Sequence, residues 1–134
     1  MAASLTHYAV VVDDDVLILM HTSDVLADAG FETIEVSDGD EARLVFDERG
    51  HEIALLFTDV QMPGSTDGFA LARYVAECWP RVEIVVASGR LRPGPDDLPE
   101  GATFIGKPFG ADLIRDHLRH TLPQERWPGP LASP

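Results

Sequence analysis

The sequence predicts an α/β fold in which a doubly wound, mostly parallel sheet of five strands carries helices on both faces. Short apolar runs rich in β-branched residues alternate along the chain with longer segments of helical period. These runs are apolar throughout, as in strands that are buried on both faces. Strands that alternate with helices in this way form parallel sheets through right-handed crossovers.

The first strand is predicted at residues 8–12, where the chain reads Tyr-Ala-Val-Val-Val. Helical spacing follows over residues 16–29, and Gly30 supplies a left-handed stop. The residues expected on the inner face of this helix are Leu19, Met20, Leu26 and Ala27.

The next strand, helix and strand follow the same pattern. Residues 31–36 are expected to form a strand, and residues 38–49 a helix with Asp38 near its cap. A third buried strand is predicted at residues 53–57, and Asp59 follows it closely.

A further helix is predicted over residues 67–79, because Pro80 cannot continue it and restricts the residue before it. Cys78 falls inside this helical pattern and is expected to be a small buried apolar residue. The fourth strand is predicted at residues 82–87.

The connection to the last strand is expected to be mainly loop. Three prolines and three glycines between residues 89 and 101 leave room for hardly more than one helical turn, around residues 96–98. The fifth strand is expected at residues 102–105 and the final amphipathic helix at residues 109–122. The inward residues expected on that helix are Phe109, Leu113, Ile114, His117 and Leu118.

Length and charge narrow the class of protein. The 134 residues suit one domain, expected at residues 1–122, with a proline-rich flexible tail at residues 123–134. A net charge of −13 argues against binding to nucleic acid or to an anionic membrane. The start of the chain lacks the pattern of a signal peptide and no apolar run suits a membrane span, so a cytoplasmic location is expected.

Polar side chains follow four of the five expected strands. Asp13, Asp14 and Asp15 follow the first strand, Asp59 the third, Ser88 the fourth and Lys107 the fifth. Singly, each has an ordinary explanation, such as a helix cap, an Asx turn or a solvated loop lysine. Together they indicate a site, because ligands of open parallel sheets bind at the carboxyl ends of the strands.

Three clustered carboxylates repel one another unless protons or a cation intervene. Mg²⁺ suits Asp13, Asp14 and Asp59 because it prefers oxygen ligands. Asp59 could then act as a nucleophile toward a phosphoryl donor. Lys107 and Ser88 could share the charge that develops on the phosphoryl oxygens.

Four segments carry a resemblance to a known family. They are Val-Val-Asp13-Asp14-Asp15, Phe-Thr-Asp59-Val-Gln-Met-Pro63, Val-Ala-Ser88-Gly89 and Phe104-Ile-Gly-Lys107-Pro108-Phe109. Over about residues 8–121 the chain resembles the receiver domains of response regulators in two-component signal transduction. The resemblance implies the flavodoxin-like sheet of strand order 2-1-3-4-5.

The resemblance also implies roles at a metal site. Asp59 matches the phospho-accepting aspartate. Asp14 matches the acid that ligates Mg²⁺ directly, and Asp13 the acid that reaches it through water. The backbone carbonyl of Gln61 matches the third protein ligand.

Further matches concern the phosphoryl group. Ser88 matches the hydroxyl that moves toward it, and Lys107 the lysine that pairs with it and precedes a cis bond to Pro108. Phe104 matches the switch aromatic of the fifth strand.

The chain departs from the family pattern in two places. The loop between Pro63 and Asp67 has one residue more than the commonest loop, which is not expected to disturb Asp59. Residues 89–101, where members of the family carry their fourth helix, are expected here to be mainly loop. This puts in doubt the family's usual relay from the residue matching Ser88 to the residue matching Phe104. The ending Val-Ala-Ser88-Gly89 is similar to that of receivers associated with HWE histidine kinases.

The expected function is that of a stand-alone receiver, a non-enzymatic module that takes a phosphoryl group from a sensor histidine kinase and switches the binding of a downstream protein. It is expected to be a monomer or a weak homodimer. One alternative is an interaction module whose phosphorylation site is unused. Another is a hydrolase with an aspartyl-phosphate intermediate, although Gln61 stands where such enzymes carry a second acid.

Overall fold

The computed structural model describes residues 7–89, 92–94, 96–122 and 128. Five strands form one parallel sheet in the order β2-β1-β3-β4-β5, which confirms the predicted fold. The strands are β1 (Tyr8–Val12), β2 (Glu32–Val36), β3 (Ile53–Asp59), β4 (Glu83–Ser88) and β5 (Thr103–Gly106). The helices are α1 (Val16–Asp28), α2 (Gly39–Arg49), α3 (Gly68–Cys78) and α4 (Ala111–Thr121), with a short 3₁₀ turn η1 (Gly50–Glu52) after α2.

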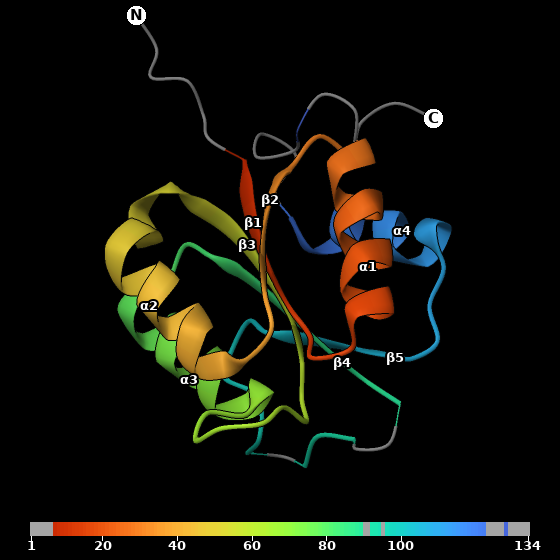
Figure 1. Ribbon diagram of the computed structural model, residues 1–134. Helices are drawn as coiled ribbons and strands as arrows, with labels where there is room; N and C mark the ends of the chain where they lie inside the picture. Colours follow the sequence, from red (N-terminus) through yellow and green to blue (C-terminus); the bar gives the residue numbers. More distant parts are fainter. Residues whose placement is uncertain (1–6, 90–91, 95, 123–127, 129–134) are drawn as a thin grey trace, which may run out of the picture.

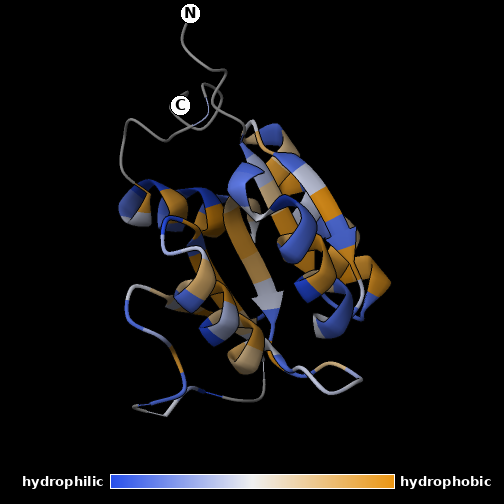
Figure 2. Ribbon diagram, turned by 90° about the vertical axis from the view of Figure 1, so that its left-hand side faces the viewer, coloured by the Kyte–Doolittle hydropathy of each residue, from blue (hydrophilic) through white to orange (hydrophobic). Residues whose placement is uncertain are grey.

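The sheet lies between two layers of helices. α1 and α4 cover one face, and α2 and α3 cover the other (Figure 1). Successive residues of β1 point to opposite faces, so that Val11 packs under α1 and Val10 under α2 and α3. In Figure 2 the central strands are coloured mostly as hydrophobic, and the helices carry both hydrophobic and hydrophilic segments.

The order of the strands creates the crevice in which ligands of this fold class bind. From β1 the chain passes to β2 on one side and then to β3 on the other, so that the order reverses between β1 and β3. Asp13 follows β1 and Asp59 ends β3, which places both acids at the mouth of this crevice.

The crossover from β4 to β5 contains no helix among its described residues, 89, 92–94 and 96–102, as predicted. Residues 96–98 form only a turn. The predicted tail, residues 123–134, lies outside the described residues except for Pro128.

Four predictions of burial were wrong. Met20 is 52% exposed, Leu113 is 47% exposed, and Ala27 and Cys78 are also exposed. Two of the buried residues of α1 are polar, Thr22 and Ser23. The spacing of apolar residues alone could not identify them as buried. Cys78 is the last residue of α3, and the side chain that turns inward at this end is its neighbour Trp79, which packs against Phe46.

No helix in the described part of the chain is both long enough and apolar enough to cross a bilayer.

Candidate functional site

The three acids that follow β1 lie in different environments. Asp15 is the N-cap of α1, where its carboxylate accepts hydrogen bonds from the backbone N–H groups of Leu17 at 3.0 Å and Ile18 at 3.3 Å. Asp13 is only 4% exposed, and its Oδ1 accepts from the N–H of Asp15 at 2.9 Å. Asp14 is exposed at the mouth of the crevice. Because Asp15 caps the helix, the Asp13 and Asp14 carboxylates are available for another task.

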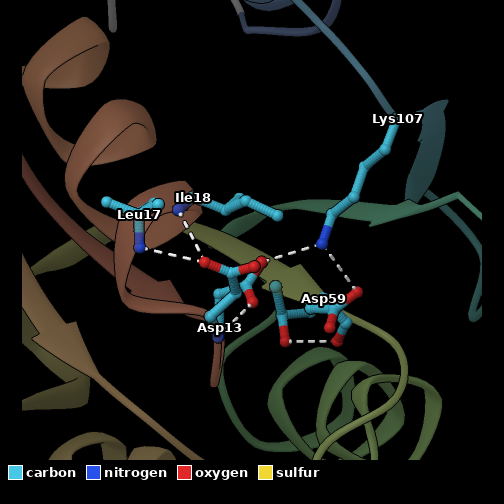
Figure 3. Close-up of polar contacts among 7 residues, drawn as sticks. Asp13, Leu17, Ile18, Asp59 and Lys107 are labelled. Atoms are coloured by element: carbon cyan, nitrogen blue, oxygen red, sulfur yellow. Dashed lines mark hydrogen bonds and ion pairs between the residues drawn. The ribbon is translucent and has the colours of Figure 1, made fainter.

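Lys107 bridges the ends of β1 and β3. Its Nζ lies 2.8 Å from Oδ2 of Asp13 and 3.1 Å from Oδ1 of Asp59 (Figure 3). The backbone N–H of Lys107 donates to the carbonyl of Ser88 at 3.1 Å, which fixes the lysine to the end of β4. It is also the only lysine in the sequence. The peptide bond from Lys107 to Pro108 is cis.

The carboxylates of Asp13, Asp14 and Asp59 offer oxygen atoms that all lie within 4.8 Å of one another. Burial raises the pKa of Asp59, and the charge of Asp13 raises it further, against the opposing effect of Lys107. Burial alone would lower the pKa of Lys107, but hydrogen bonds to Asp13 and Asp59 outweigh it and the pKa is raised. One ammonium therefore faces three carboxylates, and the excess negative charge fits a hard divalent cation such as Mg²⁺.

Three further residues predicted for the site, Ser88, Gln61 and Phe104, lie outside this cluster of acids and lysine. Ser88 is buried at the end of β4, next to the strand that carries Asp59. Gln61 is exposed, two residues beyond Asp59. Phe104 is half-buried on β5 and packs on the core cluster under α2 and α3, which is the face opposite α1.

Gly68, the first residue of α3, is a site-forming residue that the sequence reasoning missed. A Cβ at this position would lie 2.0 Å from the carbonyl oxygen of Asp59, and the N–H of Gly68 donates to the carbonyl of Val60 at 2.8 Å. Only glycine permits this approach without a shift of the backbone. The signal in the sequence was the pair Asp67-Gly68, in which Asp67 caps α3 by accepting from the N–H of Ala70 at 2.8 Å.

A hollow of about 560 Å³ adjoins the cluster on the side of α1. It is lined by Leu17, Ile18, His21, Gly89, Lys107, Pro108 and Phe109. The rings of His21 and Phe109 stack with centroids 6.3 Å apart. Leu17, which lines this hollow, is one of three exposed apolar side chains of α1. We call these side chains the α1 patch: Val16, Leu17 and Met20.

Comparison with known proteins gives a consistent result. Residues 9–119 match the family model of the response regulator receiver domain. A response regulator receiver protein from Sinorhizobium medicae is 25% identical with a TM-score of 0.76, over 89% of this chain and 96% of its own. The receiver domain of the hybrid histidine kinase CckA is 26% identical with a TM-score of 0.74, over 87% and 99%. The chemotaxis response regulator CheY4 of Vibrio cholerae is 25% identical with a TM-score of 0.74, over the same shares.

Proposed function

The chain belongs to the response regulator receiver domain family, and from this we propose that it accepts a phosphoryl group from a histidine kinase onto Asp59 in a Mg²⁺-dependent reaction. The observation that carries the proposal is the meeting of Asp13, Asp14, Asp59 and Lys107 at one edge of the sheet.

In the proposed step, a carboxylate oxygen of Asp59 attacks the phosphorus of a phosphohistidine on the kinase. A P–O bond to Asp59 forms as the P–N bond breaks, and the electron pair of that bond remains on the imidazole nitrogen. The ammonium of Lys107, 3.1 Å from Oδ1 of Asp59, lies where it can donate to an oxygen of the incoming phosphoryl group. Ser88, buried at the neighbouring strand end, is the second candidate donor.

Asp13, Asp14 and Asp59, with the backbone carbonyl of Gln61, are the groups that would hold Mg²⁺. When bound, the ion supplies positive charge that offsets the repulsion between the carboxylates and the phosphoryl oxygens. Burial, and then the charge of Asp13, raise the pKa of Asp59. A cation bound beside this carboxylate would oppose both effects and favour its ionised, nucleophilic form.

We propose that the modification switches the binding of a downstream protein, so that the chain is a binding module and does not turn over a substrate. Gaining a doubly charged group beside Lys107 changes the charge at this edge of the sheet. An association with HWE-type kinases stays a prediction from the sequence.

The experiment is labelling by small phosphodonors. Wild-type protein with Mg²⁺ and phosphoramidate or acetyl phosphate is expected to gain one phosphoryl group by intact mass spectrometry, and Asp59→Asn none. Asp24→Asn, an exposed carboxylate of α1, is the matched control and should label like wild type. Equal labelling of Asp59→Asn would contradict the proposal. A wild type that never labels favours the unused site, and continuous turnover of a small phosphoester favours the hydrolase.

A further inference from the structure

The loop between β3 and α3, residues 60–67, is tied to α2 by a single side chain, Asp40. Oδ1 of Asp40 accepts hydrogen bonds from the hydroxyl of Thr66 at 2.5 Å and from the hydroxyl of Ser65 at 2.9 Å. Oδ2 accepts from the backbone N–H of Ser65 at 3.1 Å. Three donors of one loop therefore converge on one carboxylate, and Thr66 is buried.

The backbones at this contact are also closely fitted. A Cβ at Gly39 would lie 2.2 Å from the carbonyl oxygen of Thr66, so the start of α2 can approach the loop only because residue 39 is glycine. Gly64 has a φ of +97°, and a Cβ there would lie 2.7 Å from Oδ2 of Asp40. The loop conformation and the position of Asp40 thus fit one another.

Asp40 is not needed as the cap of its own helix. The N-cap of α2 is Asp38, which accepts from the N–H of Glu41 at 2.7 Å. Glu41 in turn accepts from the N–H of Ser37 at 3.2 Å. The hydrogen bonds from Thr66 and Ser65 also lower the pKa of Asp40, which keeps it ionised.

The same loop begins directly after Asp59 and contains Gln61. At its start, Val60 is buried and its carbonyl accepts from Gly68. At its far end, Thr66 is held by Asp40. The exposed residue Gln61 lies between these two anchors. If the second anchor is released, ordering of the Gln61 carbonyl has to take place when the metal binds, and this costs affinity.

We propose that Asp40 is a positioning residue of the metal site, which sets the β3–α3 loop so that the Gln61 carbonyl is in place for Mg²⁺. The inference rests on the proposed function, since it assigns the loop to the same site.

The test is a Mg²⁺ titration of the metal-free protein, followed through the NMR amide signals of Asp13 and Val60. Asp40→Asn is expected to bind Mg²⁺ about tenfold more weakly, equivalent to about 1.4 kcal/mol. Glu41→Gln is the matched control, because it removes the same charge from the same helical turn without contacting the loop, and its affinity should equal that of wild type.

Two further measurements separate positioning from a loss of folding. Thr66→Val removes one donor from the loop side and should also weaken Mg²⁺ binding. The double variant with Asp40→Asn should be little weaker than Asp40→Asn alone, because both changes break one tie. In metal-free Asp40→Asn, hydrogen exchange at the Ser65 amide should accelerate, because that amide loses its carboxylate acceptor.

The outcomes are distinguishable. If wild type binds Mg²⁺ and both Asp40→Asn and Thr66→Val bind it equally well, only this inference is overturned. If wild type binds no Mg²⁺ at all, the proposed function fails and the inference fails with it. Weaker binding by Asp40→Asn and Thr66→Val, with Glu41→Gln unchanged, supports the inference.

Discussion

The effect of Lys107 on metal binding can be measured directly, because its ammonium and a bound cation would compete for the same carboxylate oxygens. Its ammonium contacts both Asp13 and Asp59. Lys107→Gln is therefore expected to tighten Mg²⁺ binding by about tenfold, equivalent to about 1.4 kcal/mol, because it removes a cation that repels the ion. It is also expected to slow phosphorylation by phosphoramidate. Isothermal titration calorimetry and the labelling rate measure the two effects.

The matched control for this change is Arg81→Gln. Arg81 is exposed and precedes β4, so it lies at the opposite edge of the sheet from the site while its replacement removes the same charge. Mg²⁺ affinity should not change in this variant. Weaker Mg²⁺ binding in Lys107→Gln would show that the lysine orders the acids and does not compete with the ion.

For single residues, the sequence predicted the acids of the site but not the contacts of Asp40. The strand ends could be found because each follows a continuous apolar run, and the topology then forces Asp13 and Asp59 together. The role of Asp40 could not be found, because its partners Ser65 and Thr66 follow it by 25 and 26 residues. Nothing in local spacing links residues so far apart.

At the scale of the elements, we expect the contact between α4 and β5 to make the free energy of unfolding depend on pH. Nε2 of His117 lies 2.6 Å from the hydroxyl of Thr103, and the histidine is half-buried. Burial lowers the pKa of His117, and the nearby His120 lowers it further. The unfolded chain then binds the proton more readily, so the free energy of unfolding should fall as the pH falls below about 6.5, the ordinary value for histidine.

Urea unfolding of wild type and His117→Gln between neutral and mildly acidic pH measures this contribution, because other titrating groups are common to both proteins. The fall in stability on acidification should be smaller in His117→Gln. His51→Gln, which replaces an exposed histidine of η1, should keep the wild-type dependence. Parallel curves for wild type and His117→Gln would contradict the assignment.

The positions of the helices and strands in the sequence were largely predictable, but the side of a helix that packs on the sheet was not. Prolines and glycines between β4 and β5 disfavour a helix whatever the tertiary context, so the lack of a helix among the described residues of this crossover could be predicted directly. The start of α1 reads Val-Leu-Ile-Leu-Met, apolar on every side, so periodicity could not tell that Leu19 is buried and Met20 exposed. Only the packing on the sheet decides this.

For the whole molecule, the position of the α1 patch bears on how a phosphoryl donor approaches. Transfer needs the phosphorus within about 3–3.5 Å of an Asp59 oxygen, so the donor protein must cover the surroundings of the site. On the α1 side these surroundings are the apolar hollow beside Lys107 and the exposed side chains of Val16 and Leu17. Exposed apolar groups grouped in this way favour a protein partner.

Leu17→Glu is therefore expected to separate the two phosphodonors. Leu17 is 77% exposed, so the change should leave the fold intact. Labelling by phosphoramidate is the control for any effect of the new charge on Lys107, which lines the same hollow, and should change less than transfer from a kinase. Transfer from a phosphorylated histidine kinase that acts on wild type should slow by about fivefold or more, because a charge would be buried at the contact. Leu44→Glu on α2 is the matched control, since Leu44 is 64% exposed on the opposite face of the sheet. Equal transfer to both variants would mean that the kinase approaches Asp59 without covering α1.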